Sequence, residues 1–193
     1  LMVANSYLGE HRSFNGLLMQ KMRGDRGLNY GDYSYIENFI QDGGSRFPVP
    51  NIPRSQQYFS IWIRPVPHHN AHFALRQAIR ELKLLVDDGL SQEAFEASRE
   101  FLLNYSKLYV QTTSRRLGYL LDSRFYGYRD FLEEIQDRLP RLTVDEVNAA
   151  IRRHLQYDNF GIAIVTSDAE EFGGVLLGNA PSAPSYGGAV TEE

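Results

Sequence analysis

Apolar residues at the start of the chain recur at helical spacing. From Met2 to about Arg23 they would lie on one face of a helix, which predicts a helix over residues 2–23. Gly24 and Gly27 follow this run, and glycine is common at helix ends. The first predicted element is therefore a helix that stops at this pair of glycines.

Two strand-like segments come next, with a loop between them. Residues 30–40 are rich in tyrosine, isoleucine and phenylalanine, and residues 58–64 read Tyr-Phe-Ser-Ile-Trp-Ile-Arg. Aromatic and β-branched residues favour strands. The intervening residues 47–53 contain three prolines, which cannot donate to a sheet ladder. This pattern predicts an antiparallel pair of strands joined through a loop.

The remainder of the chain is predicted to be mostly helical. Ser91 is the expected N-cap of one helix, and Thr143 with Glu146 matches the capping box of another. Residues 161–166, Gly-Ile-Ala-Ile-Val-Thr, predict a last strand. The expected helices span residues 71–87, 92 to beyond 108, 114–125, 128–139 and 144–155.

The order of these elements indicates the fold class. A helix, two strands, several helices and a final strand predict an α+β fold in which an antiparallel sheet packs against helices. Three strands make a small sheet for so many helices, so we expect a first strand to precede Leu1 in a longer parent chain. Residues 1–178 are predicted to form one domain. Residues 179–193, rich in Pro, Ser and Gly, are predicted to be a mobile tail.

Composition excludes several classes of function. Among 193 residues, 20 basic and 24 acidic side chains give a formal net charge of −4, which does not favour binding to a phosphate backbone. The absence of cysteine removes disulfides, Cys-ligated metals and thiol nucleophiles. No apolar run reaches the about 20 residues of a membrane-spanning helix. Nucleotide-binding glycine motifs and the serine-hydrolase elbow are also missing.

Three histidines stand close together and could form a surface metal site. His68, His69 and His72 follow Pro67, and His68 and His72 would share one face of a helix. No carboxylate lies near them in the sequence to complete or orient such a site. A polar helix start is the interpretation we favour, and a small metal-binding module remains the weaker alternative.

The pentapeptide Tyr-Leu-Gly-Glu-His at residues 7–11 resembles the zinc motif His-x-x-Glu-His with Tyr7 in place of the first histidine. That motif needs two imidazoles one helical turn apart, with the Glu beside them as general base. A neutral phenol is a poor substitute for imidazole, so no zinc ligand is assigned here.

Residues 18–34 show a family resemblance. After a helix that ends near Arg23, the chain reads Arg-Gly-Leu-Asn-Tyr at residues 26–30 and Tyr-Ser at 33–34. This combination resembles the C-terminal, non-zinc domain of the pitrilysin/insulinase metallopeptidases. Residues 87–96 and 142–147 resemble later segments of the same domain, so the likeness covers nearly the whole chain.

The resemblance implies a role in a zinc-dependent peptidase. Members of the family place two similar halves around a substrate chamber, and the zinc and its general base belong to one half. The other half contributes an Arg and a Tyr that bind peptide substrate near the scissile bond, and these residues fall on Arg23 and Tyr30. The segment itself is then expected to hold no cofactor and to be inactive alone, with zinc in a partner half on the same chain or a separate subunit.

The chemistry of this pair is coherent. The two glycines end the helix between Arg23 and Tyr30, so both side chains can converge where the helix passes into the strand. Arg offers a fixed fork of donors and Tyr a single O–H, and neither must lose a proton to act. Arg26 is a competing candidate that could instead pair with Asp25. The alternative function is a catalytically silent structural or assembly subunit of the same fold.

Overall fold

The structure, a computed structural model, describes residues 1–11, 13, 15–36 and 47–186. It is dominated by helices and contains one small sheet. The elements in chain order are α1 (Met2–Gly9), α2 (Leu17–Met19), the π-helical turn η1 (Gln20–Gly24), β1 (Asp32–Tyr35), β2 (Ser60–Ile63), α3 (His68–Asp88), α4 (Gln92–Tyr105), the 3₁₀ turn η3 (Ser106–Val110), α5 (Thr113–Phe125), α6 (Phe131–Arg138), the 3₁₀ turn η4 (Leu139–Arg141), α7 (Val144–His154) and α8 (Ala169–Leu177).

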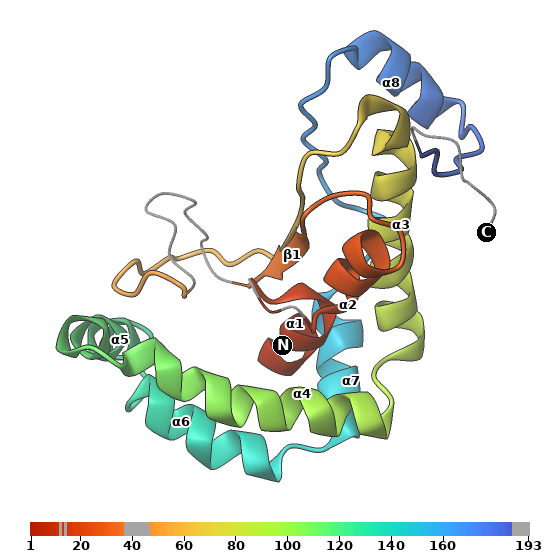
Figure 1. Cartoon of the computed structure of the whole chain (residues 1–193). Coiled ribbons are helices and arrows are strands. Elements are labelled where there is room, and N and C mark those ends of the chain that lie inside the picture. The colour runs from red at the N-terminus through yellow and green to blue at the C-terminus, as the bar shows by residue number, and fades with distance from the viewer. Residues whose placement is uncertain (12, 14, 37–46, 187–193) are drawn as a thin grey trace.

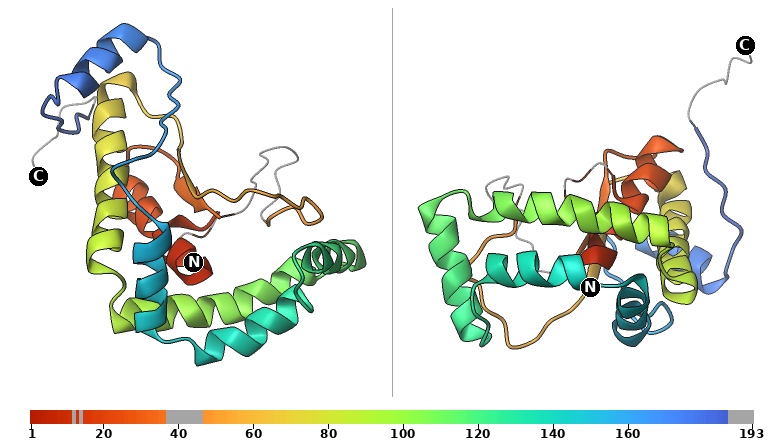
Figure 2. Two further views of the ribbon diagram at one scale, coloured as in Figure 1. Left: turned by 180° about the vertical axis from the view of Figure 1, so that it is seen from behind. Right: turned by 90° about the horizontal axis from the view of Figure 1, so that it is seen from below.

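Two long helices give the molecule an angular shape (Figure 1). Helix α3 stands upright, and α4 runs across its lower end, with α6 alongside α4 and α5 beyond its far end. Helix α8 covers the upper end of α3, and the view from behind shows the same arrangement (Figure 2). The short helices α1 and α2 and the sheet lie in the angle between the two long helices.

The sheet consists of β1 and β2 in antiparallel pairing, with Asp32 opposite Ile63 and Tyr35 opposite Ser60. All four residues of β1 are buried. A two-stranded sheet is marginal by itself and needs packing against helices, and here α1 and α2 supply it. The predicted α+β fold with an antiparallel sheet against several helices is thereby confirmed.

One main hydrophobic core joins the helices. It gathers apolar side chains from α1, α3, α4 and α7, including Leu8, Leu85, Phe95 and Ile151. Helix α1 is buried on almost every side, because six of its eight residues are inaccessible. Because of this central position α1 presents no polar face to solvent, and even its polar residues Asn5 and Ser6 are buried.

The prediction of one helix over residues 2–23 is wrong, because the chain breaks between α1 and α2. Gly9 ends α1, and the two helices meet at Gly9 and Gly16. A Cβ added to Gly16 would lie 2.8 Å from the Gly9 Cα. The helical spacing of apolar residues continues across the break since both helices bury their apolar side chains in the same interior.

The predicted strand over residues 161–166 is also wrong. These residues form no strand, and the side chain of Val165 is fully exposed. A strand needs a ladder partner, and no described residue pairs with residues 161–166. An apolar, β-branched sequence therefore stays extended here without joining the sheet.

Most helix ends occur where the sequence predicts them. Gly89 takes a left-handed conformation (φ 74°) at the end of α3, and the Ser91 hydroxyl caps α4 by accepting from the Ala94 N–H. Thr143 and Glu146 form the predicted capping box of α7. Helix α3 begins three residues earlier than expected, and α8 was not predicted.

None of the helices in the described part of the chain is long and apolar enough to cross a membrane.

Two predicted segments lie partly outside the described residues. The strand expected over residues 30–40 corresponds to β1 only, and its positions 37–40 are not described. Of the expected tail, residues 179–186 are described and contact α3. The Asn70 side chain exchanges two hydrogen bonds with the Ser185 backbone (2.8 and 2.9 Å), and Arg76 donates to the Ala180 carbonyl (2.8 Å).

Candidate functional site

The candidate site is built by the turn that connects η1 to β1. The last helical carbonyls are satisfied across the turn, because the Gly27 N–H donates to the Arg23 carbonyl and the Leu28 N–H to the Met22 carbonyl, each at 2.9 Å. Gly27 adopts φ 59°, a conformation that most side chains resist. The sharp reversal leaves Arg23 at the helix end and Tyr30 at the approach to β1.

Arg23 and Tyr30 meet across this turn. The guanidinium carbon of Arg23 lies over the Tyr30 ring, 4.3 Å from its centroid. The Tyr30 side chain is 66% exposed and Arg23 is half-buried. The structure thus brings together the two residues selected from the sequence, and it leaves them accessible rather than sealed in the core. Whether they bind substrate stays a prediction.

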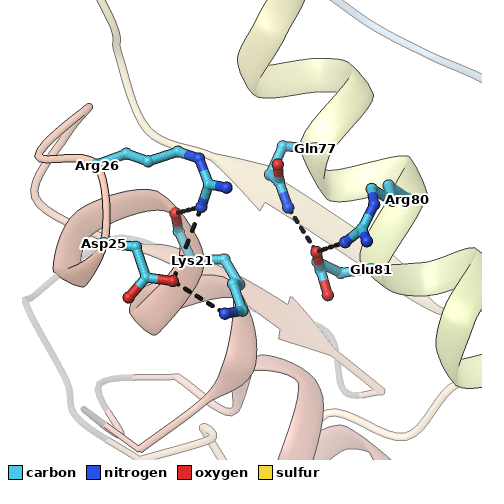
Figure 3. Close-up of polar contacts among 6 residues, drawn as sticks. All are labelled: Lys21, Asp25, Arg26, Gln77, Arg80 and Glu81. Carbon is cyan, nitrogen blue, oxygen red and sulfur yellow. Dashed lines mark hydrogen bonds and ion pairs between the residues drawn. The ribbon is translucent and has the colours of Figure 1, made fainter. Parts of the chain in front are cut away.

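Arg26, the competing arginine, closes the helix end. Its Nη1 donates to the Lys21 carbonyl (2.8 Å) and lies 3.8 Å from an oxygen of Asp25. Figure 3 shows Lys21 reaching the same carboxylate, at 2.9 Å. These bonds hold the exposed loop end of η1 in place. Arg26 thus forms the ion pair with Asp25 that was considered from the sequence.

A buried aspartate anchors the other side of the turn. Asp32, the first residue of β1, accepts at Oδ1 from the Asn29 side chain (2.8 Å) and from the Arg64 N–H (3.0 Å). Asn29 also donates to the Arg64 carbonyl (3.0 Å) and accepts from the Gly31 N–H (3.1 Å). Tyr30 therefore lies between Asn29 and Asp32, whose side chains bond the backbone of Arg64, the residue that follows β2.

Asp32 has an unusual electrostatic environment. It is fully buried, and its second oxygen, Oδ2, has no hydrogen-bond partner among the described residues. Burial raises the pKa of Asp32 to about 6, against the opposing effect of the hydrogen bonds from Asn29 and Arg64. The carboxyl that supports the turn therefore titrates near neutral pH.

A second polar cluster lies on α3, across from the Lys21, Asp25 and Arg26 side chains (Figure 3). Glu81 is buried and accepts from Gln77 (2.5 Å) and Arg80 (2.8 Å). The pKa of Tyr7 on α1 is raised by burial and by the charge of Glu81, while Lys21 opposes the shift. Packing of α2 and η1 against α3 thus brings charged groups of both signs to the two sides of this helix contact.

The motif at residues 7–11 does not form a zinc site. Helix α1 ends at Gly9, so Glu10 and His11 leave the helical face that carries Tyr7. The Glu10 carboxylate accepts from Tyr109, and His11 Nδ1 lies 2.7 Å from the Tyr35 hydroxyl. Across residues 1–11, 13, 15–36 and 47–186, no group of three or more His, Cys, Asp or Glu side chains could hold a metal ion.

The three clustered histidines begin α3 and do not converge. His68 contacts Glu171 through Nε2 (3.2 Å) and Thr166 through Nδ1 (3.1 Å), so it ties α3 to α8. His72 packs edge-on against Phe172, with ring centroids 6.5 Å apart. The contact with Glu171 links residues far apart in the sequence, which local spacing could not reveal.

Comparison with known proteins rests on the three-dimensional structure. No protein-family model matches the sequence, and no curated protein matches it significantly. Among solved structures, a peptidase M16 inactive domain from Pseudomonas fluorescens matches with a TM-score of 0.63 and 22% identity, over 81% of this chain and 34% of that chain. A conserved protein from Enterococcus faecalis V583 matches with a TM-score of 0.54 and 18% identity, over 79% and 32%.

These matches decide the fold. The chain has the fold of a peptidase M16 inactive domain. This confirms the fold expected from the family resemblance. The chain spans about a third of the length of each solved structure.

Sequence reasoning missed the buried polar residues around the site. Asp32 stands in a run of aromatic residues and carries no motif, so only its burial distinguishes it. Glu10 was noticed as part of a zinc-like motif, but its partner Tyr109 lies far along the chain. No local sequence signal marks such a long-range pair.

Proposed function

We propose that this chain is the non-catalytic, substrate-binding half of a zinc-dependent peptidase, with Arg23 and Tyr30 as the residues that bind peptide near the scissile bond. The observation that carries the proposal is the accessible Arg23–Tyr30 stack, 4.3 Å from guanidinium carbon to ring centroid. Support comes from the fold, which is shared with a peptidase M16 inactive domain.

The stack suits a role in binding a peptide carbonyl. The ring holds the guanidinium plane by a cation–π contact, and Arg and Tyr together supply N–H and O–H donors without any change in protonation. Donors aimed at a carbonyl oxygen stabilise the negative charge that develops on it when water attacks. The loss of one such donor typically raises the activation free energy by about 2.7–4 kcal/mol.

The proposal places zinc outside residues 1–193. The described residues form no group that could hold a metal ion, and residues 7–11 do not share a helical face. A zinc-bearing half, on the same chain or a separate subunit, would supply the metal and the general base. This chain's contribution is then to bind and orient the peptide.

Peptide cleavage by the chain combined with its zinc-bearing half is the test. Arg23→Ala and Tyr30→Phe should each lower kcat/KM by roughly 100- to 1,000-fold if the lost group donates to the developing charge. Arg26→Ala is the matched arginine control, since Arg26 bonds the helix end instead of Tyr30. Tyr58→Phe is the matched tyrosine control, because Tyr58 is also exposed (57%).

Two outcomes would contradict the proposal. Unchanged kcat and KM in both site variants would show that Arg23 and Tyr30 do not bind substrate. A stable complex of the chain with its partner half that cleaves no peptide would favour the silent structural subunit.

A further inference from the structure

A cavity lies beside α1, and neither Arg23 nor Tyr30 lines it. Its volume is about 220 Å³, below the roughly 300–1,000 Å³ of pockets for drug-sized ligands. The walls come from α1, residues 48–57, α4, η3, α5 and the start of α6. The space therefore fits a small molecule.

A buried carboxylate lines this cavity. Glu10 is only 6% exposed, and its Oε1 accepts from the Tyr109 hydroxyl. The other oxygen, Oε2, is buried and has no partner among the described residues. Burial raises the pKa of Glu10 against the effect of the side-chain hydrogen bonds from Tyr109 and Ser6. A positively charged group beside Oε2 would satisfy the empty oxygen and stabilise the ionised carboxylate.

Two further charged side chains line the same cavity with unsatisfied atoms. Asp122 uses Oδ2 to accept from the Asn51 N–H (2.6 Å), while its Oδ1 is buried and has no partner in the described residues. Arg54 uses Nη2 to donate to the Ile36 carbonyl (3.0 Å) and to Gln57 (2.5 Å), while its Nη1 is likewise buried and unsatisfied. All three residues belong to the cavity wall.

These opposite charges do not satisfy one another. Within the described residues, no ion pair of 4.0 Å or less joins Arg54 to Glu10 or to Asp122. Two carboxylate oxygens and one guanidinium nitrogen are thus unpaired, and the three residues that carry them line the same cavity. Buried polar groups in folded proteins are almost always hydrogen-bonded, so a partner beyond the described residues is expected to bind them.

We propose that the cavity binds a small zwitterion, whose ammonium group lies against Glu10 and Asp122 and whose carboxylate lies against Arg54. Apart from Asn5 and Gln57, the remaining wall is apolar and aromatic, with Leu102 and Phe131 among its residues, so the ligand carries an apolar side chain. Free amino acids and short peptides share this chemistry. The site is separate from the proposed peptide-binding turn and stands whether or not the chain serves a peptidase.

Calorimetric titration of the full chain with four probes tests the proposal. L-leucine and the dipeptide leucyl-leucine carry both charges, leucinamide lacks the carboxylate, and N-acetyl-leucine lacks the ammonium group. At least one of the two zwitterions should bind with one-to-one stoichiometry, and both singly charged probes should bind roughly 10-fold or more weakly than it does. If leucine binds more tightly than leucyl-leucine, the ligand is a free amino acid, and if leucyl-leucine binds more tightly, it is a short peptide.

Substitutions assign each charge to its part of the ligand. Arg54→Gln should abolish the preference for the zwitterion over leucinamide, while Asp122→Asn and Glu10→Gln should weaken the preference over N-acetyl-leucine. Asp122 is only half-buried, so Asp122→Asn provides a folded variant even if Glu10→Gln does not fold. Asp137→Asn and Arg138→Gln are matched controls on the exposed surface of α6 (52% and 67% exposed) and should leave affinity unchanged.

The proposal is overturned if no probe binds, if all four bind equally well, or if Arg54→Gln and Asp122→Asn leave the affinities unaltered. In each case ordered water alone would satisfy Glu10, Asp122 and Arg54. Because neither Arg23 nor Tyr30 lines the cavity, variants of those residues should not affect this titration, and failure here would leave the proposed peptidase role untouched.

Discussion

Arg23 and Tyr30 lie face to face, with the guanidinium carbon 4.3 Å from the ring centroid, although one ends a helix and the other precedes a strand. The hydrogen bonds of Gly27 and Leu28 to the helix end fix the reversal that joins them. Since Tyr30 is mostly exposed, the pair can be altered without disturbing the core.

Removing the phenol oxygen and removing the whole ring should have different effects. Tyr30→Phe keeps the ring over Arg23 and loses one O–H donor, whereas Tyr30→Ala loses both. We expect Tyr30→Phe to leave the free energy of unfolding within about 0.5 kcal/mol and Tyr30→Ala to lower it by about 0.5–1 kcal/mol, the value of an exposed cation–π contact. Urea unfolding measures both. Full peptidase activity in Tyr30→Phe combined with loss in Tyr30→Ala would show that the ring only positions Arg23.

The stability of the protein should fall as pH rises through the titration of Asp32. Its pKa is about 6 in the folded state against 3.8 ordinarily, so the folded state binds the proton more tightly. The contribution of the neutral carboxyl is complete below about pH 4 and is lost between about pH 4 and 6, at a cost of about 3 kcal/mol.

Asp32→Asn isolates this effect from that of other carboxyls. The amide keeps an oxygen to accept from Asn29 and Arg64 and has no charge to desolvate. The difference in unfolding free energy between variant and wild type should therefore grow in favour of the variant from pH 4 to pH 6 and then level off. Asp25→Asn, at an exposed aspartate of the same turn, serves as the control. A difference that does not change with pH would mean that Asp32 has an ordinary pKa.

The contact between Gly9 and Gly16 should not tolerate a side chain. A Cβ at Gly16 would lie 2.8 Å from the Gly9 Cα, so Gly16→Ala must push α1 and α2 apart. We expect a loss of about 1–3 kcal/mol in the free energy of unfolding, as for other overpacked sites. Gly24→Ala is the matched control because nothing lies within 4 Å of its added Cβ. Thermal or urea unfolding should show the first variant destabilised and the second unaffected or slightly stabilised.

The capping box of α7 offers a test of local helix stability. Thr143→Ala removes the hydroxyl that accepts from the Glu146 N–H, which should cost about 1 kcal/mol. Thr143→Ser keeps an oxygen in that position and should cost much less. Equal stability of the two variants in urea unfolding would show that the cap contributes nothing.

The helices were largely predictable from the sequence because their ends carry local signals. Ser91, Gly89 and the Thr143–Glu146 pair act within a few residues, so their geometry follows from spacing alone. The position of Arg23 opposite Tyr30 was predictable for the same reason, since two glycines mark the reversal between them. The substrate role came from family resemblance, and the structure leaves it as a proposal.

The errors arose where distant segments decide the outcome. The break between α1 and α2 depends on the contact of Gly9 with Gly16, which an apolar period cannot reveal. Residues 161–166 have every property of a strand except a partner. Likewise, the buried carboxyls of Asp32 and Glu10 owe their environment to Arg64 and Tyr109, far along the chain.

The unpaired stretch from Phe160 to Val165 has a practical consequence. It reads Phe-Gly-Ile-Ala-Ile-Val, without charge or proline, and its large side chains are exposed. Segments of this kind template cross-β aggregation, and flanking charges restrain them. Asp158 and Asp168 stand at its two ends. Removing both charges with Asp158→Asn and Asp168→Asn should therefore make concentrated samples of this chain precipitate more readily.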